Sequence, residues 1–290
     1  MEISKNLNIV VLGASGMLGY AVFRYLNETG HYTIRGTIRS NTIKRQMPAK
    51  LQEMVIDGID VEHTDSLIGF FSDFKPDVVI NCVGLVKQLD AAQDPLIVLP
   101  INSLLPHRLA ALCKAVGARL IHFSTDCVFS GNKGMYREDD TSDADDLYGR
   151  SKFFGEVAYP HCLTLRTSII GHELIGSRSL VGWFLSQTGA VDGYDKAIFS
   201  GLPTVEIAKI LVEFVLPNKS LAGLYHLSAK PINKYELLLL IAKSYGKDIE
   251  IRRNSRVVID RSLDSSQFRN ATNYVPPSWL ELIERMREFE

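Results

Sequence analysis

The chain of 290 residues is 46% apolar and 22% charged, which supplies a sizeable hydrophobic core and excludes disorder as its dominant state. Its 32 lysines and arginines balance 33 aspartates and glutamates at a net charge of −1, so no basic field is available to hold nucleic acid or an anionic membrane. The length favours one large domain or two unequal domains that share an interface.

The first half of the chain alternates between strand-like and helix-like segments. Residues 7–12 (LNIVVL) form a continuous apolar run, which predicts a buried strand of a parallel sheet. A glycine-rich turn follows, and a helical pattern then continues to about Thr29 and ends at Gly30. Further strands are predicted at 32–38, 54–56, 77–83 and 119–124, with helices at 66–74 and 102–116. Strands interleaved with helices in this way predict right-handed βαβ units, a Rossmann-type doubly wound sheet and an α/β fold class.

The second half is less regular. The stretch 172–199 has scattered glycines and no clean period, so we expect helix and loop there. Strands are predicted at 163–167 and 223–228, and helices at 144–159, 204–215, 234–245 and 279–288. We therefore expect an NAD(P)-binding Rossmann domain over residues 1–168 and a smaller mixed α/β substrate-binding region over 169–290, with segments that return to the Rossmann sheet.

Features of a membrane or secreted protein are not found. The densest apolar stretch, 237–242, is much shorter than a bilayer-spanning helix, and the N-terminus does not have the pattern of a signal peptide. The four cysteines, at 82, 113, 127 and 162, have no spacing typical of metal ligands. These patterns favour a cytoplasmic protein with reduced thiols and no metal site.

A glycine triplet lies between the first strand and the first helix. Gly13, Gly16 and Gly19 recur at every third position, and this strand–turn–helix context is typical of dinucleotide binding. Glycines let the backbone N–H groups approach a pyrophosphate, and the helix N-terminus adds partial positive charge. The alternative is a purely structural turn.

The residues after the second strand indicate which coenzyme is bound. An acidic residue there would bind the ribose 2′-hydroxyl of NAD, whereas an arginine suits the 2′-phosphate of NADP. The chain has Arg39 and Ser40 at this point and no acid until Glu53, which favours NADP over a solvated basic loop. Asp60 and Val61, after the third strand, lie where the adenine is expected, although Asp60 is equally suited to a turn.

A tyrosine and a lysine lie four residues apart in the predicted helix 144–159. Tyr148 and Lys152 would share one helix face, and a nearby ammonium would lower the pKa of the phenol toward working pH. Such a tyrosine can act as a general acid or base in carbonyl–alcohol interconversion. Thr125 ends the fifth strand, so its hydroxyl is expected at the ligand-binding edge of the sheet, beside Tyr148.

The ordered set GASGMLG, FSTDCVFSG, YGRSKFFGE and LTLRTSIIG resembles the extended short-chain dehydrogenase/reductase superfamily. Within it, the chain is most similar to the dTDP-4-dehydrorhamnose reductase (RmlD-like) family, and the resemblance covers nearly the whole chain. It implies reduction of the 4-keto group of a nucleotide-linked 6-deoxysugar with NADPH or NADH, by a monomer or homodimer.

The resemblance also implies roles for particular residues. Thr125, Tyr148 and Lys152 would form the catalytic triad, and Tyr148 and Lys152 would also contact the coenzyme. The glycine turn would bind the coenzyme together with its neighbours Ser15, Met17 and Leu18 and with the end of the fourth strand, Asn81, Cys82 and Val83.

Two departures from the family pattern concern the substrate. Cys127 stands where the family usually has tyrosine, and the stretch from Asn81 to Gln88 lacks the usual alanine-rich and threonine-containing sequence. The sugar or its nucleotide is therefore open. The residues expected to bind the substrate are Lys87, Gln88, Thr125, Asp126, Cys127, Arg178 and Arg261. The arginines suit a diphosphate because guanidinium pairs bidentately with phosphate oxygens. A structural ion pair is an equally good explanation for either arginine.

Four alternatives to a dTDP-4-dehydrorhamnose reductase-like enzyme follow from the same residues. An epimerase, or a 4-reductase acting on a UDP- or GDP-linked sugar, would use the same triad. A dehydratase is disfavoured because Cys127, and not a second carboxylate, follows Asp126. A non-catalytic nucleotide-binding subunit, resembling the regulatory subunit of methionine adenosyltransferase, would act through a protein partner.

Overall fold

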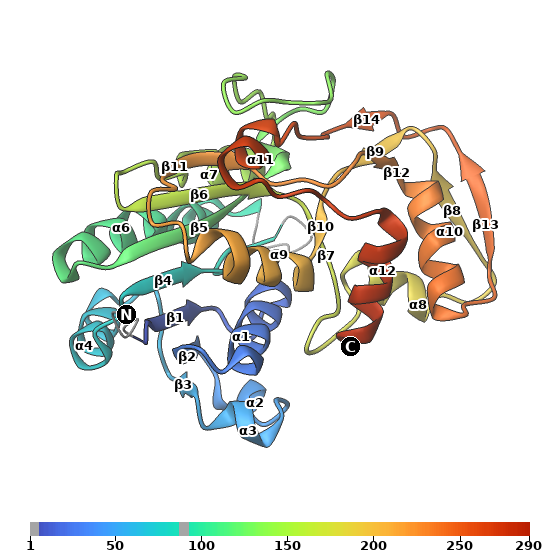
Figure 1. Cartoon of the computed structure of the whole chain (residues 1–290). Helices are drawn as coiled ribbons and strands as arrows, with labels where there is room; N and C mark the ends of the chain where they lie inside the picture. The colour runs from blue at the N-terminus through green and yellow to red at the C-terminus, as the bar shows by residue number, and fades with distance from the viewer. Residues whose placement is uncertain (1–5, 87–92) are drawn as a thin grey trace.

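The computed structural model describes residues 6–86 and 93–290. Its centre is a seven-stranded sheet in the order β11-β6-β5-β4-β1-β2-β3, in which every neighbouring pair is parallel (Figure 1). The strands of this sheet are β1 (Asn8–Leu12), β2 (Thr33–Ile38), β3 (Val55–Asp57), β4 (Val78–Asn81), β5 (Arg119–Thr125), β6 (Cys162–Thr167) and β11 (Gly223–His226). The predicted doubly wound parallel sheet is therefore confirmed, and the second half of the chain contributes its edge strand β11.

Helices cover both faces of the sheet. On β1, Ile9 and Val11 belong to one buried apolar cluster, and Val10 and Leu12 belong to the other, because successive side chains of a strand point to opposite faces. The helices that bury these two faces are α1 (Met17–Thr29) and α9 (Thr204–Ile210, continued by η4, Leu211–Val215) on the first, and α4 (Thr64–Phe74) and α6 (Leu105–Val116) on the second. Burial on both faces explains the continuous apolar runs of these strands.

The helix before β5 is longer than predicted. It begins after Asp94, whose side chain caps it, and it runs through α5 (Pro95–Val98) and the π-helical η2 (Leu99–Leu104) into α6. Among the described residues this is the one helix whose length and composition would allow it to cross a membrane, and half of its apolar window is buried inside the protein. Its buried side chains pack against β4 and β5.

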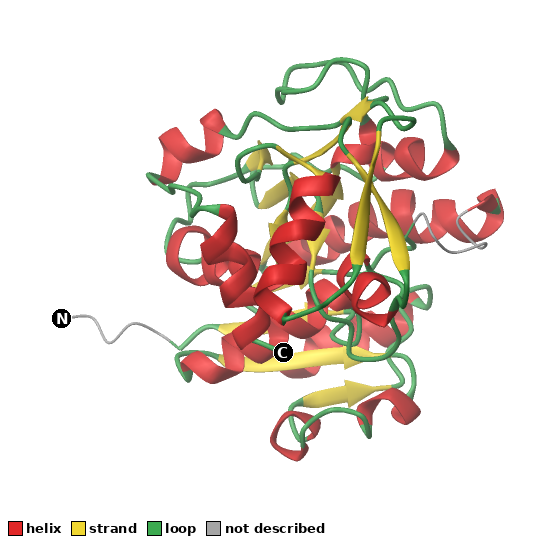
Figure 2. Cartoon of the chain, turned by 90° about the vertical axis from the view of Figure 1, so that its right-hand side faces the viewer, coloured by secondary structure: helices red, strands yellow, loops and turns green. Residues whose placement is uncertain are grey.

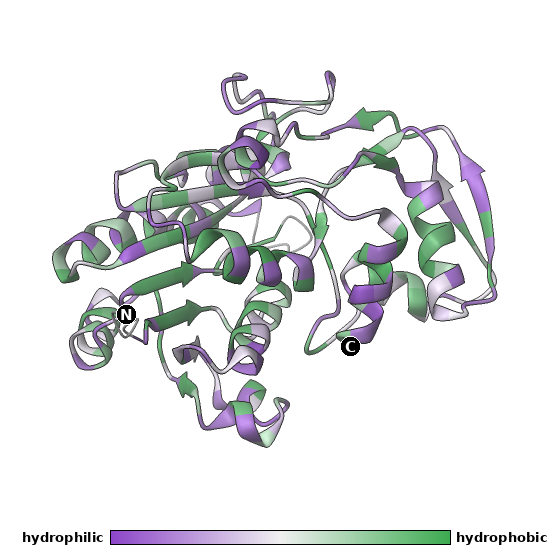
Figure 3. Ribbon diagram, in the orientation of Figure 1, coloured by the Kyte–Doolittle hydropathy of each residue, from purple (hydrophilic) through white to green (hydrophobic). Residues whose placement is uncertain are grey.

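Residues after β6 build a second lobe of short elements, on the right of Figure 1 and turned toward the viewer in Figure 2. Its small sheets pair β7 (Ile169–Ile170) with β10 (Leu202–Pro203), β8 (Ala190–Tyr194) with β13 (Glu250–Asn254), and β9 (Ala197–Phe199) with β12 (Ile232–Asn233) and β14 (Ile259–Asp260). Its helices are α8 (Leu180–Ser186), α10 (Lys234–Tyr245) and α12 (Trp279–Glu288). Helix α11 (Ser266–Thr272) instead contacts β11 at the edge of the large sheet (Figure 1). In Figure 3 the central strands are mostly green and apolar, whereas β13 is mostly purple and hydrophilic.

The remaining elements are short and lie near the candidate site or the edge of the sheet. They are α2 (Asn41–Lys44), α3 (Ala49–Gln52), the 3-10 helix η3 (Asp126–Val128) and α7 (Leu147–Phe154). Helix α7 is shorter than the predicted 144–159, because the side chain of Asp146 caps its start and Gly155 ends it against the carbonyl of Asn102. The strands β8 and β9 were not predicted within 172–199.

Candidate active site

The glycine turn packs tightly between β1 and α1. Gly13 has a positive φ of 78°, and its carbonyl lies so close to Gly19 that a Cβ at Gly19 would overlap it. Gly16 directly precedes α1 as its N-cap residue, and none of the described side chains caps the helix there. An N-terminus of this kind, with glycine on its approach, fits the pyrophosphate of a dinucleotide.

The packing at Gly19 gives a direct test. We expect Gly19→Ala to lower the free energy of unfolding by about 1–3 kcal/mol, because the added methyl group forces backbone apart. Gly69 is the matched control: it also lies within a helix, but a Cβ there meets open space. Urea denaturation of both variants measures the difference. Equal stabilities would show that the turn tolerates a side chain.

The residues after β2 are only partly available to a ligand. Arg39 and Ser40 are exposed, and Ser40 caps α2 by accepting a hydrogen bond from the amide of Thr42. The neighbouring Lys44 is occupied, because its Nζ donates to the carbonyl of Val55 at 2.8 Å. Arg39 is thus an exposed cation of this segment, and its contact with a phosphate stays a prediction.

Asp60 forms a turn. One of its oxygens accepts a hydrogen bond from the amide of Glu62 at 3.0 Å, and the other lies 3.3 Å from Nδ1 of His63. Val61 is buried in the second apolar cluster. The turn reading of Asp60 is therefore supported, and a contact of either residue with adenine stays a prediction.

The end of β4 lies against the glycine turn. Asn81 is buried, its Nδ2 lies 3.1 Å from Nδ1 of His122, and its Oδ1 accepts a hydrogen bond from the amide of Val83. The amide of Cys82 donates to the carbonyl of Leu12, and Val83 packs on Gly13. The predicted coenzyme residues of β1 and β4 are therefore adjacent. The predicted substrate residues Lys87 and Gln88 lie outside the described residues.

The three predicted catalytic side chains converge at the end of β5. A Cβ at Gly149 would overlap the carbonyl of Cys127, so this glycine lets α7 approach η3 closely. The approach brings the phenol of Tyr148 close enough to the hydroxyl of Thr125 for the two groups to interact. Lys152 is buried beside Phe123, to whose carbonyl its Nζ donates at 2.7 Å.

The electrostatics of Tyr148 differ from the expectation. Burial raises the pKa of its phenol above the ordinary value, the thiol of Cys127 adds to this effect, and the hydrogen bond with Thr125 only partly opposes it. The expectation that Lys152 lowers this pKa was wrong, because the ammonium is directed to the carbonyl of Phe123 and burial dominates. The phenol is therefore protonated near neutral pH, as a proton donor must be.

Lys152 connects the triad with the coenzyme side of the site. Its Nζ lies 3.7 Å from the position of a Cβ on Gly84, just after β4. Burial lowers the pKa of Lys152 to about 8, and the nearby carboxylate of Glu156 opposes that effect. The ammonium form thus prevails below about pH 8 and can donate hydrogen bonds to a ligand at this position.

Of the other predicted substrate residues, three lie at the triad (Asp126, Cys127 and Arg261), whereas Arg178 does not. Asp126 and Cys127 follow Thr125 in η3, and Arg261 reaches them from the second lobe: its Nε donates to the carbonyl of Phe129 at 2.7 Å, and its Nη1 lies 3.9 Å from Sγ of Cys127. Arg178 is exposed in the loop before α8, and the contacts found for it are with Glu173.

Sequence reasoning missed two sets of supporting residues. Asn102 lies in η2, and its side chain holds both the amide and the carbonyl of Leu85 and donates to the hydroxyl of Ser151, so it ties the segment after β4 to α7. An amide directly after the apolar residues Leu96–Val98 and Ile101 was the available indication. Behind the triad, Glu156 and Arg166 form a buried bidentate pair, with both contacts at 2.7 Å.

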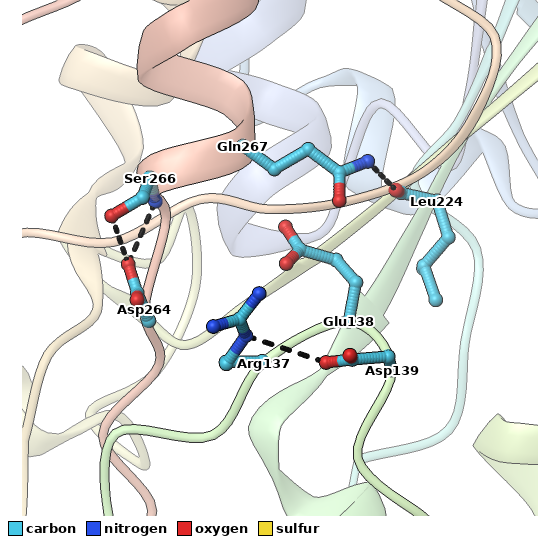
Figure 4. A pocket seen from close by; sticks show the side chains of 7 residues that line it. All are labelled: Arg137, Glu138, Asp139, Leu224, Asp264, Ser266 and Gln267. Carbon is cyan, nitrogen blue, oxygen red and sulfur yellow. Dashed lines mark hydrogen bonds and ion pairs between the residues drawn. The ribbon is translucent and has the colours of Figure 1, made fainter.

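Two cavities lie away from the triad. One, of about 480 Å³, lies between β11 and the start of α11 and is lined mainly by polar side chains (Figure 4). The other, of about 790 Å³, lies between α1 and the second lobe. Neither is lined by a predicted site residue.

The chain is similar in sequence to a family model and to several named proteins. The family model described as the RmlD substrate binding domain matches residues 7–286. A Haloferax volcanii protein named a probable low-salt glycan biosynthesis reductase is 32% identical over 63% of this chain, which spans 61% of that relative's length. Methionine adenosyltransferase 2 subunit beta of Xenopus tropicalis is 27% identical over 82% of this chain and 72% of its own.

Solved structures share the fold. A dTDP-4-dehydrorhamnose reductase from Bacillus anthracis in complex with NADP has a TM-score of 0.80 over 98% of this chain and all of its own, at 20% identity. A Bordetella bronchiseptica enzyme in complex with NAD and UDP has a TM-score of 0.76 over 98% of this chain and 95% of its own, also at 20% identity.

Proposed function

This chain belongs to the RmlD substrate binding domain family, and we propose that it is an NADPH-preferring reductase of a nucleotide-activated 4-keto-6-deoxysugar. The observation that carries the proposal is the convergence of Thr125, Tyr148 and Lys152, with the Nζ of Lys152 also near Gly84, in the segment after β4. The names of the glycan biosynthesis reductase and of the NADP-bound reductase support the same reaction class.

In the proposed reaction, bound NADPH would supply the hydride that reaches the sugar carbonyl carbon. Tyr148 donates its phenolic proton to the carbonyl oxygen as negative charge develops there. The raised pKa of Tyr148 suits this acid role, because the phenol stays protonated until the oxygen becomes strongly basic. Thr125 hydrogen-bonds the same oxygen, and Lys152 would hold the nicotinamide ribose.

Recognition of the sugar nucleotide is proposed for the second lobe, residues 169–290. Arg261 reaches the triad from this lobe and lies beside Asp126 and Cys127, so we assign these three side chains to the sugar or its diphosphate. Arg178 is proposed as a second contact with the diphosphate. The product would serve the synthesis of a surface polysaccharide or another glycoconjugate.

A substrate panel tests the function. Purified protein and NADPH are mixed with dTDP-, UDP- and GDP-linked 4-keto-6-deoxysugars, and the nicotinamide absorbance is followed. We expect oxidation of NADPH with at least one sugar. An epimerase would instead convert the sugar without net oxidation of NADPH, which chromatography of the products would reveal.

A second candidate has support from the relatives. Several of them are named methionine adenosyltransferase 2 subunit beta and match more than four-fifths of this chain. A regulatory subunit of that kind would bind nucleotide and a partner enzyme without turnover. Co-purification of a methionine adenosyltransferase, together with no NADPH oxidation on any sugar of the panel, would favour this function over a reductase.

The coenzyme preference is tested at Arg39. We expect Arg39→Ala to weaken NADPH binding by about tenfold or more, because one charge-assisted contact with the 2′-phosphate is lost, and to leave NADH binding unchanged. Titrations followed by nicotinamide fluorescence measure both affinities. Arg108, an exposed arginine of α6, is the control, and Arg108→Ala should leave both affinities unchanged. Equal weakening of NADPH and NADH binding would contradict the assignment.

A further inference from the structure

The end of α7 is joined to β5 at two consecutive residues of the strand. Lys152 donates to the carbonyl of Phe123 at 2.7 Å, and one helical turn later Glu156 accepts a hydrogen bond from the hydroxyl of Ser124, also at 2.7 Å. Ser124 directly precedes Thr125, the last residue of the strand. The carboxylate of Glu156 therefore links the helix that carries two triad residues to the strand that carries the third.

This carboxylate is held in one orientation. The amide of Glu156 donates to the carbonyl of Phe153 at 3.1 Å, which continues the last turn of α7. Arg166, the direct partner of Ser124 across β5 and β6, donates from Nε to one carboxylate oxygen and from Nη2 to the other, both at 2.7 Å. The side chains of Arg166 and Glu156 are 3% and 10% exposed. Three charge-assisted hydrogen bonds thus fix the carboxylate where little water can replace them.

The guanidinium of Arg166 is in turn held by β11. Its Nη1 lies 3.2 Å from Nε2 of His226, and because a guanidinium only donates, this imidazole nitrogen is the acceptor. The proton of the ring is then on Nδ1, which donates to the carbonyl of Tyr136 at 3.0 Å. Tyr136 lies in the segment that connects η3 with α7. Polar contacts behind the triad therefore join β5, β6, β11 and both ends of α7.

We propose that Glu156 is a positioning residue of the reduction, which holds α7 and β5, through Ser124 and Arg166, at the separation that brings the triad side chains together. The inference rests on the proposed function. Displacement of a reacting group by about 1 Å can slow a reaction by roughly 10²-fold. Because Glu156 acts through the helix and the strand, its loss should slow the chemical step and leave coenzyme binding nearly unchanged.

The test is single-turnover oxidation of NADPH by Ser124→Ala, followed by stopped flow with protein and sugar in excess. The variant removes the hydroxyl that joins the carboxylate to β5 and keeps the ion pair with Arg166. We expect the rate constant to fall roughly tenfold or more, with full amplitude and an NADPH affinity within about twofold. Misfolding would lower the amplitude and not the rate constant. An unchanged rate constant would overturn the proposal.

Ser228→Ala is the matched control. Ser228 is 3% exposed, and its hydroxyl donates to the carbonyl of Leu263 at 2.8 Å, so this variant also loses a buried hydrogen bond. Its rate constant should equal that of the unmodified protein. An equal fall in both variants would mean that loss of any buried hydroxyl slows the reaction, and the role assigned to Glu156 would be wrong.

A structural measurement separates this inference from the proposed function. If the unmodified protein reduces no sugar of the panel, the proposed function fails, and the position of α7 is then measured by crystallography. In Ser124→Ala the distance between Nζ of Lys152 and Oγ1 of Thr125 should change by about 0.5 Å or more, the tolerance within which catalytic groups must be held. An unchanged distance would overturn the role of Glu156 without reference to activity.

Discussion

Replacing Tyr148 with phenylalanine is expected to lower kcat by about 10²-fold or more on any sugar that the protein reduces. The substitution removes one oxygen atom and keeps the aromatic ring. The developing alkoxide then has no acid to protonate it. Steady-state NADPH oxidation measures the loss.

The control for this variant is coenzyme affinity. Because Lys152 and the glycine turn are untouched, loss of the contact between the Tyr148 hydroxyl and the coenzyme should weaken NADPH binding much less than it lowers kcat. Replacement of Tyr159, an exposed tyrosine outside the site, by phenylalanine should leave kcat unchanged. Full turnover by the Tyr148 variant would mean that another group supplies the proton, and the mechanism proposed above would be wrong.

Replacing Arg166 with methionine is expected to lower the free energy of unfolding by about 3–5 kcal/mol, because it leaves a buried carboxylate without its partner. Arg166 is 2% exposed, and its guanidinium binds both oxygens of Glu156 and lies 5.2 Å from the ring centre of Phe129. Methionine keeps much of the side-chain volume, so the lost charge dominates the effect. Urea denaturation at pH 7 measures the change.

The double variant Arg166→Met with Glu156→Gln separates charge from packing. Once both charges are removed, the remaining amide can still accept the 2.7 Å hydrogen bond from the hydroxyl of Ser124, so we expect more than half of the lost stability to return. A single variant that unfolds within 1 kcal/mol of the unmodified protein would show that water solvates Glu156. The same pair matters for catalysis, since Glu156 follows α7 and Ser124 precedes Thr125.

Patterns local in sequence predicted much of this molecule. The apolar run at β1 and the glycine triplet after it fix a strand, a turn and a helix within about 25 residues, and the structure has all three. Tyr148 and Lys152 could be found because their spacing on one helix turn is itself a local property. Thr125 could also be found from a local property, because it stands at the end of the strand pattern of β5.

What could not be predicted depends on distant partners. The strand β13 has the sequence EIRRN, which is mostly exposed and pairs with β8 about 60 residues earlier, so neither segment has the apolar run of a core strand. The contact of Arg261 with Phe129 joins positions 132 residues apart. The direction of the Tyr148 pKa shift depends on how deeply the phenol is buried. The spacing of Tyr148 and Lys152 in the sequence does not predict that burial.

The position of β11 limits where the polypeptide can be cut into separate parts. This strand comes from the second half of the chain, yet it completes the edge of the large sheet beside β6. A polypeptide cut after residue 168 would leave the backbone amides and carbonyls of β6 open to pairing with other molecules, which favours aggregation. We therefore expect the two halves to melt in one cooperative transition, and a chimaera that exchanges substrate lobes between relatives must bring residues 223–226 with the transplanted half.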